Sequence, residues 1–309
     1  MATFDQLKTG DLFVCTDSNG VTYKVAWDKI DDIVLPKVGV WHIKNISGGY
    51  VNITDYDRIE TVDGHNINAG GAAYKPTSGE YLVYGNLARF RESTANWDFG
   101  PLTDTTPVDD FSYLCFSSPK FNGDISTIDV SNGFNLSYLF NSCSAFNQPV
   151  THFNTSKANT MRGMFKRSNF NQPVSHFDTS NCESLVIMFA DCPFNKDISG
   201  WDVSKVKEMN GMFDYNSSFN QNISGWNTKS VINMTNSFRY ASAFNQDLSQ
   251  WCVSSVEYAS NTFYGSGTPS SKYPKWGTCP RGEDGNAAAA AASTEPVYES
   301  YDDINAITN

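Results

Sequence analysis

Histidines, carboxylates and cysteines are the residues through which this chain could perform chemistry. His152 and His176 are 24 residues apart, and each precedes a phenylalanine. A fold that stacks the two segments would bring the imidazoles to about 5 Å, a distance at which they could share a metal ion. No carboxylate or third ligand recurs beside them, so we predict no metal site and interpret both histidines as polar residues of a turn.

The carboxylates suggest two further chemistries. Asp124, Asp197 and Asp247 share one position of a repeated pattern, where a row of carboxylates could bind calcium, but the copies between them carry proline or asparagine. A polysaccharide depolymerase needs two carboxylates about 5 to 10 Å apart in a groove, which the sequence does not exclude. Nucleophile-elbow, phosphate-loop and zinc-protease motifs are not found in the sequence. We therefore predict a non-enzymatic protein without a cofactor.

Seven cysteines form no C-x-x-C pair, and their number is odd. They are Cys15, Cys115, Cys143, Cys182, Cys192, Cys252 and Cys279. Two of them, Cys143 and Cys192, stand two repeats apart, hence about 10 Å, which is too far for a disulfide. We expect free, buried thiols.

A tandem repeat must position all of these residues. A Phe-Asn pair recurs at intervals of 24 or 25 residues, and a large apolar residue follows each phenylalanine by seven positions. The pairs begin at Phe121, Phe146, Phe170, Phe194, Phe219 and Phe244, and the apolar residues are Ile128, Phe153, Phe177, Trp201, Trp226 and Trp251. A third mark with the same period is Leu139-Phe140, Met164-Phe165, Met188-Phe189, Met212-Phe213, Ser237-Phe238 and Thr262-Phe263, with Cys115-Phe116 one period upstream.

A repeat of this length predicts a solenoid, in which each coil buries its apolar face against its neighbours. The apolar spacing within a coil favours one short strand and one compact helical or 3₁₀ turn. Trp201, Trp226 and Trp251 should stack with Phe153 and Phe177 in an internal aromatic column.

The repeated asparagines leave two interpretations open. Asn147, Asn171, Asn195, Asn220 and Asn245 could form a hydrogen-bonded ladder that satisfies turn backbone groups, which we favour, or a ligand-binding row. Variable positions such as Lys205, Lys207, Glu208, Ile232 and Asn233 should form one exposed face that can change without disturbing the core.

Four segments follow from these patterns. Residues 90–276 are the predicted solenoid, in which Phe90, seven residues before Trp97, opens an irregular first coil that ends at Phe116, and three prolines (Pro269, Pro274, Pro280) cap the far end. Residues 277–309 read as a flexible linker with an acidic tail, which either orders on a partner or has no function.

The remaining two segments precede the repeats. Residues 1–35 predict a β-hairpin with strands at 11–16 and 21–27 around Asn19-Gly20, either an attachment module or a β-cap of the following domain. Residues 36–89 predict a small β-sandwich-like domain with strands at 38–43, 50–53, 57–62 and 80–84, in which an immunoglobulin-like and a carbohydrate-binding module stay open.

The units FNKDISGWDVSKVKEMNGMF and FNQNISGWNTKSVINMTNSF carry a family resemblance. They are similar to the bacterial surface-protein repeat of about 26 residues found in Listeria, Mycoplasma and Bacteroides surface lipoproteins, which is grouped with BspA-like leucine-rich repeats. The resemblance covers roughly residues 90 to 265 and is strongest in the last three units. It implies a mainly β, leucine-rich-repeat-like solenoid with an interaction role, and it implies no catalytic residue.

A second, local resemblance concerns the segment GDLFVCTDSNGVTYKVAWDKIDD. It looks like the short N-terminal module of structural proteins from tailed phages, notably marine cyanophages. The chain starts without a secretion or lipoprotein signal and has no apolar stretch of membrane-spanning length. A protein with adhesin-type repeats can still reach the outside if it is built into a virus particle that lysis releases.

We therefore expect a virion structural protein of a tailed phage, assembled in the host cytoplasm and displayed as a fibre, decoration or adhesion element. Its partners would be other virion proteins and a host receptor or glycan, and we expect it to be oligomeric in the particle. The formal net charge of −11 argues against gripping nucleic acid, and we expect no membrane insertion. The alternative is a bacterial cell-surface adhesin with the same repeats.

Overall fold

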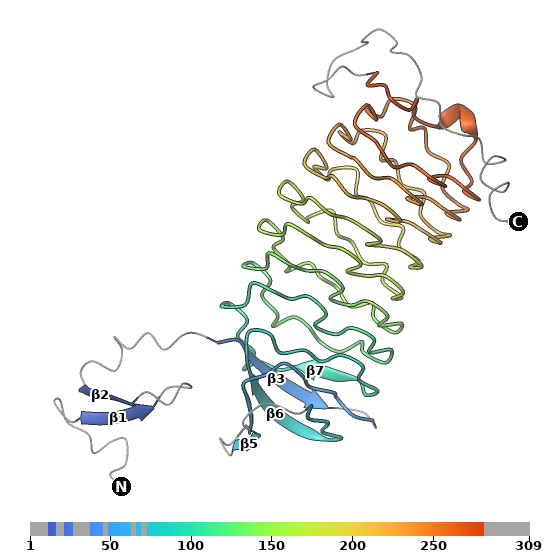
Figure 1. Ribbon diagram of the computed structural model, residues 1–309. Coiled ribbons are helices and arrows are strands. Elements are labelled where there is room, and N and C mark those ends of the chain that lie inside the picture. Colours follow the sequence, from blue (N-terminus) through green and yellow to red (C-terminus); the bar gives the residue numbers. More distant parts are fainter. Residues whose placement is uncertain are drawn as a thin grey trace, which may run out of the picture. The chain divides into compact units, whose positions relative to one another are not determined.

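The computed structural model describes residues 12–16, 22–26, 38–45, 49–62, 66–68 and 73–280 (Figure 1). Two compact units divide the chain, Met1–Lys37 and Val38–Asn309. In the first unit, β1 (Leu12–Thr16) pairs antiparallel with β2 (Thr22–Ala26), from Leu12 opposite Ala26 to Thr16 opposite Thr22. The two strands lie where the sequence predicts a hairpin, while the Asn19-Gly20 turn and the tail after residue 280 lie outside the described residues.

The second unit begins with a five-stranded antiparallel sheet in the order β5-β4-β6-β3-β7. Its strands are β3 (Val40–Asn45), β4 (Arg58–Thr61), β5 (Asn66–Asn68), β6 (Gly79–Tyr84) and β7 (Trp97–Phe99). Trp41 on β3 lies opposite Val83 on β6, which in turn lies opposite Ile59 on β4, and all three side chains are fully buried. One face of the sheet is therefore apolar.

The predicted β-sandwich is wrong for the described residues, which form one sheet. The expected strand at 50–53 reduces to an isolated bridge between Ile53 and Tyr74. β7 comes from the segment assigned to the repeats and pairs with β3, so residues 89 and 90 do not separate two units. The apolar face packs on the first coil instead of a second sheet, since the Trp41 ring lies 5.7 Å from Phe90 and 6.1 Å from Phe111.

Beyond the sheet, the repeats lie side by side as a row of coils, green to orange in Figure 1. One parallel bridge joins each coil to the next at the same position of the repeat. The bridged residues are Asp110, Asn135, Thr160, Ser184, Glu208, Asn233 and Tyr258. Around each bridge, backbone N–H groups donate to carbonyls of the following coil, for example Leu136 to Thr160 at 3.0 Å and Phe140 to Met164 at 2.9 Å.

The coils contain neither the expected strand nor a helix. The stretch at Trp201 and Val203 is irregular, and in the described residues the sole 3₁₀ helix is η3 (Ser270–Lys272) in the end cap. Two residues in each of the stacked coils have a left-handed backbone, such as Ile187 (φ 49°) and Asp191 (φ 52°), which interrupts any regular element. Within the described part of the chain, no helix has the length and apolarity needed to cross a membrane.

The register of the first coil differs from the prediction. The N–H of Cys115 donates to Leu139 just as that of Phe140 donates to Met164, so Leu114-Cys115, rather than Cys115-Phe116, corresponds to Leu139-Phe140. The Phe90 N–H makes the same bond to Leu114, so Phe90 occupies the Phe140 position and Trp97 is not the counterpart of Trp201. Spacing alone misled the alignment because this coil has a different length.

The far end of the stack is closed by residues 268–280. The N–H groups of Leu248 and Val253 donate to the carbonyls of Lys272 and Thr278, so the cap continues the coil pattern past residue 276. A disulfide joins Cys252 to Cys279, across 27 residues. The expectation that all cysteines stay free is therefore wrong for this pair, because the cap folds back onto the last coil and brings Cys279 beside it.

Candidate binding groove

The repeat phenylalanines lie at the centre of the stack. All six are fully buried, and each ring stacks on the equivalent ring of the next coil, at distances from 5.7 to 6.3 Å. The rings are Phe121, Phe146, Phe170, Phe194, Phe219 and Phe244. A second column runs from Phe140 to Phe263, and within a coil the two columns touch, as at Phe165 and Phe170 (3.8 Å). The core is thus continuous from coil to coil.

The residue seven positions after each repeat phenylalanine is also buried. Trp226 stacks between Trp201 at 6.4 Å and Trp251 at 6.1 Å, and Phe177 extends the column at 6.3 Å from Trp201. Phe153 lies at the same repeat position and is buried. These side chains are packing residues and are not exposed to a ligand.

A side-chain donor reaches back from each of these coils to one carbonyl of the coil before, which we call the shared carbonyl because it lies four residues after the repeat phenylalanine each time. The bonds are His152 to Ile125 (3.0 Å), His176 to Val150 (2.9 Å), Trp201 to Val174 (3.0 Å), Trp226 to Ile198 (3.0 Å) and Trp251 to Ile223 (3.1 Å). A carbonyl oxygen only accepts, so each imidazole donates from Nε2.

Histidine and tryptophan therefore satisfy the same buried carbonyl by different routes. Where phenylalanine occupies the column, the histidine before it donates, and where tryptophan occupies the column, its own indole N–H donates and Gly200 or Gly225 stands in the histidine position. This accounts for the His152 and His176 pair as a packing device. Among the described residues, no group of three or more His, Cys, Asp or Glu side chains could hold a metal ion.

The repeated asparagines form a ladder along the stack. The side-chain oxygen of each asparagine accepts the backbone N–H of its equivalent in the next coil, at 2.8 to 3.0 Å. The row is Asn96, Asn122, Asn147, Asn171, Asn195, Asn220 and Asn245. At its end, the Lys272 ammonium donates to the carbonyl and side-chain oxygens of Asn245, at 2.8 and 3.0 Å. These oxygens are used by the backbone.

Replacing Asn147 by alanine should lower the free energy of unfolding by about 1 to 2 kcal/mol, because it removes the acceptor for the half-buried Asn171 N–H and for Gln172. Asn147→Asp keeps an acceptor oxygen and should cost less than the alanine variant. Urea denaturation of the three proteins measures the difference. Equal losses in both variants would show that the side-chain oxygen is not what the fold needs.

The aligned aspartates serve turns of single coils. The side-chain oxygen of Asp124 accepts the N–H of Ser126, and those of Asp197 and Asp247 accept from Ser199 and Ser249, at 2.8 to 2.9 Å. Asparagines make the same turn elsewhere, as Asn222 does with Ser224 at 3.1 Å. The row is therefore a set of turn residues.

These turns predict a loss of stability in acid. Hydrogen bonds from the serine two residues on lower the pKa of Asp178, Asp197 and Asp247 below the ordinary range. A carboxylate with a lowered folded pKa stabilises the fold above its unfolded pKa of about 4, and this contribution disappears as the pH falls through the folded pKa. The melting temperature should therefore hold above about pH 5 and fall below it. Because asparagine keeps the turn but does not titrate, the triple Asp→Asn variant should show a smaller acid shift.

Four cysteines outside the disulfide are buried and free: Cys115, Cys143, Cys182 and Cys192. Burial raises the pKa of Cys143, Cys182 and Cys192 to about 12. Two of these thiols donate to core carbonyls, Cys143 to Cys115 and Cys192 to Phe170. They stay protonated at neutral pH and are not nucleophiles.

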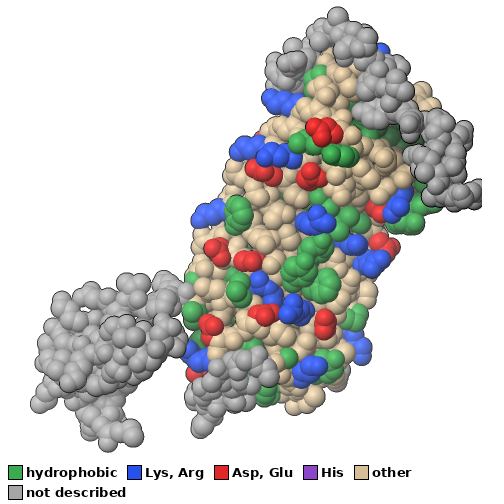
Figure 2. All heavy atoms as spheres, viewed as in Figure 1, with side chains coloured by type: hydrophobic (Ala, Val, Ile, Leu, Met, Phe, Trp, Pro, Cys, Tyr) green, Lys and Arg blue, Asp and Glu red, His purple; other side chains and the backbone are tan. Residues whose placement is uncertain are grey.

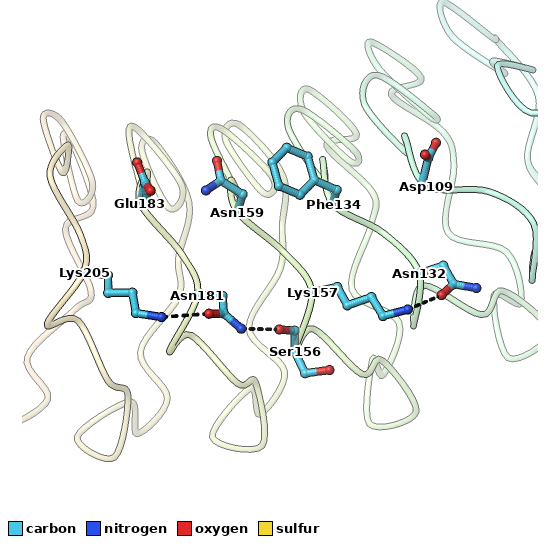
Figure 3. Close-up of a pocket in the computed structure, with 9 residues that line it drawn as sticks. All are labelled: Asp109, Asn132, Phe134, Ser156, Lys157, Asn159, Asn181, Glu183 and Lys205. Atoms are coloured by element: carbon cyan, nitrogen blue, oxygen red, sulfur yellow. Dashed lines mark hydrogen bonds between the residues drawn. The ribbon is translucent and has the colours of Figure 1, made fainter.

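A groove of about 670 Å³ crosses the exposed face of several successive coils (Figure 3). Two rows of side chains flank it, each with one member per coil. One row is Asn132, Lys157, Asn181 and Lys205, and the other is Asp109, Phe134, Asn159 and Glu183, with Ser156 beside the first row. Phe134 is the one aromatic member, and 56% of it is exposed.

Hydrogen bonds between coils fix the first row. The Lys205 ammonium donates to the Asn181 side-chain oxygen at 2.8 Å, and the Asn181 amide donates to the Ser156 carbonyl at 2.9 Å (Figure 3). Lys157 binds Asn132 in the same way at 2.5 Å. The geometry is preorganised, so a ligand would meet amides and ammonium groups already held in a line.

The charges of the groove balance. Two lysines and two carboxylates line it, and Lys207 of the next coil pairs with Glu183 at 2.8 Å, which lowers the pKa of Glu183. Figure 2 shows one face of this unit, where side chains of both charge signs alternate with hydrophobic ones. Such a surface suits neutral, hydrogen-bonding partners better than a polyanion.

Sequence reasoning identified one groove residue, Lys205, as a variable surface position. It missed the others because they share no residue type along the repeat. Their signal is positional: the rows stand 11 and 13 residues after the repeat phenylalanine or its equivalent, where neighbouring coils differ most in chemistry.

Comparison with known families identifies the repeats. The family described as Mycoplasma protein of unknown function, DUF285, matches residues 82–193 and again residues 168–276. Searches of curated proteins and of solved structures give no match. The two family matches together span more than half of the chain.

Proposed function

This chain belongs to the DUF285 family, and from that premise we propose that it is a non-enzymatic contact protein built on a leucine-rich-repeat-like solenoid. The parallel bridges, the asparagine ladder and the stacked rings support the solenoid assignment, because all of them repeat once per coil. The proposed mechanism is display: the coils hold a surface in place, and no bond is made or broken.

The groove carries the proposal. Its two rows of polar side chains project from successive coils whose cores do not depend on them, so partner contacts can vary while the fold persists. The thiols are protonated and buried, and the aligned carboxylates are held in turns, which supports contact in preference to catalysis. A host receptor or glycan fits the balanced charge of the groove.

The proposed setting is the virion of a tailed phage, with the chain bound to other virion proteins and present in several copies. The resemblance of residues 10–32 to N-terminal modules of phage structural proteins supports this setting. The β1–β2 hairpin would be the attachment module. Cys252–Cys279 suits a protein that is assembled in the host cytoplasm and becomes oxidised after release.

A bacterial cell-surface adhesin is the second candidate. The family's description as Mycoplasma proteins favours it, and the disulfide suits it equally well. In that setting the same groove would contact a host molecule.

Mass spectrometry of purified particles and of the cell envelope from the encoding culture separates the two settings. Particles should be washed in high salt first, and the chain quantified against the major capsid protein. Tens to hundreds of copies per particle would indicate capsid decoration, and a handful would indicate a tail or fibre component. Recovery only from the bacterial envelope would contradict the virion proposal and support the adhesin.

A further inference from the structure

Three tyrosines line the edge of three consecutive coils away from the groove, and we call them the tyrosine stripe: Tyr215, Tyr240 and Tyr264. Their exposed fractions are 51, 39 and 43%. The ring centroids of Tyr215 and Tyr240 lie 4.7 Å apart, and those of Tyr240 and Tyr264 lie 5.3 Å apart. We propose that this stripe binds an extended, uncharged polysaccharide chain by stacking. The proposal goes beyond the contact role of the groove and concerns a separate surface.

Backbone strain is the first argument. Tyr215 and Tyr240 have φ angles of 56° and 55°, in the left-handed region that disfavours bulky side chains. The equivalent position in the next coil is Gly265 and in an earlier coil Asp191, which adopt this backbone more readily. Exposed tyrosines at strained positions contribute little burial in return, so their presence points to a contact outside the chain.

The space beside the rings is the second argument. A β-carbon at Gly265 would lie 2.6 Å from the Tyr240 ring, so glycine at this position leaves room for the ring. The tyrosine of one coil thus leans over the next coil, and the rings form one continuous row. A row of rings in line matches a ligand whose units also repeat in line.

The electrostatics of the stripe select an uncharged ligand. Arg239 lies beside Tyr215, with its guanidinium 5.2 Å from the ring centroid. Asp214 binds this guanidinium with both carboxylate oxygens, at 2.8 and 2.7 Å. The ion pair cancels its own charge and holds polar groups next to the rings, so neither a polyanion nor a polycation gains from the site.

A sugar chain fits these groups chemically. A pyranose ring has a face of C–H groups that packs on an aromatic ring and an edge of hydroxyls that pairs with the phenol, carboxylate and guanidinium groups beside it. A protein partner is the weaker alternative, because the exposed side chains of the stripe are tyrosines without aliphatic neighbours, whereas protein interfaces mix aromatic and aliphatic contacts.

Saturation-transfer NMR on the full chain tests the proposal with cellohexaose, chitohexaose and maltohexaose as probes. At least one hexasaccharide should bind, and the variant Y215N/Y240N/Y264N should bind it about tenfold or more weakly. Asparagine tolerates the left-handed backbone, so the melting temperature should not fall. The single variant Tyr240→Asn should weaken binding in part, and it keeps the test decisive if the triple variant does not fold.

Two controls locate the site. Phe134→Ala in the groove should leave hexasaccharide binding unchanged, and so should Tyr113→Asn, which makes the same change at a left-handed position (φ 59°) in the first coil. Binding of none of the three probes, undiminished binding by the stripe variants, or equal loss in either control would overturn the proposal. None of these results bears on whether the chain is found in virions, so failure here and failure of the proposed function remain distinct.

Discussion

Replacing Trp226 by alanine should lower the free energy of unfolding by about 3 to 5 kcal/mol. The side chain is 3% exposed and stacks between Trp201 and Trp251, so the substitution opens a cavity in the middle of the aromatic column. It also leaves the Ile198 carbonyl without its indole donor. Urea denaturation measures the change, and a loss below about 1 kcal/mol would show that the column is not part of the core.

The chain itself offers a matched rescue of this position. Trp226→Phe should lose the hydrogen bond to the Ile198 carbonyl, and adding Gly225→His should restore it, because His176 and Phe177 already make this arrangement in an earlier coil. A β-carbon at Gly225 meets no atom within 4 Å. The double variant should be more stable than Trp226→Phe alone. If the histidine brings no gain, the equivalence of histidine and tryptophan at the shared carbonyl fails.

Removing the Cys252–Cys279 disulfide should cost about 3 kcal/mol, since the bridge closes a loop of 27 residues in the unfolded chain. The variant C252S/C279S should melt at a lower temperature than the wild type. A reductant should lower the melting temperature of the wild type towards that of the variant and leave the variant unchanged.

Peptide mapping with a thiol-specific reagent provides the control for this prediction. Cys252 and Cys279 should react only after reduction. Labelling of both in the unreduced, unfolded protein, together with a melting temperature that does not respond to reductant, would contradict the bridge.

Much of the stack could be predicted from sequence because its core uses the same residue types in each coil. Phe194 and Asn195 recur at a fixed interval, and a residue that must stack on its own equivalent leaves a periodic signal. The same reasoning placed Trp226 inside. Even the turn interpretation of His152 followed from the lack of further metal ligands, although its hydrogen bond to Ile125 did not.

The rest depends on relations that carry no periodic signal. The shared carbonyl is satisfied by histidine in some coils and tryptophan in others, so a search for one conserved donor type does not find it. Cys252 and Cys279 do not stand in a recurring repeat position, and only the fold of the cap brings them together. The groove and the tyrosine stripe consist of the positions that differ between coils, and their geometry emerges only when the coils stack.

Amide hydrogen exchange across residues 82–276 tests most directly the claim that the repeats form stacked coils held by side-chain ladders. The coils lack regular strands and helices, yet the N–H groups of Asn147, Asn171 and Asn195 donate to the side-chain oxygen of the coil before. These amides should exchange far more slowly than unstructured loops and should share the protection of the core, with Asn147→Ala releasing the Asn171 amide. Exchange of these amides at the rate of an unfolded chain would contradict the stacked-coil account.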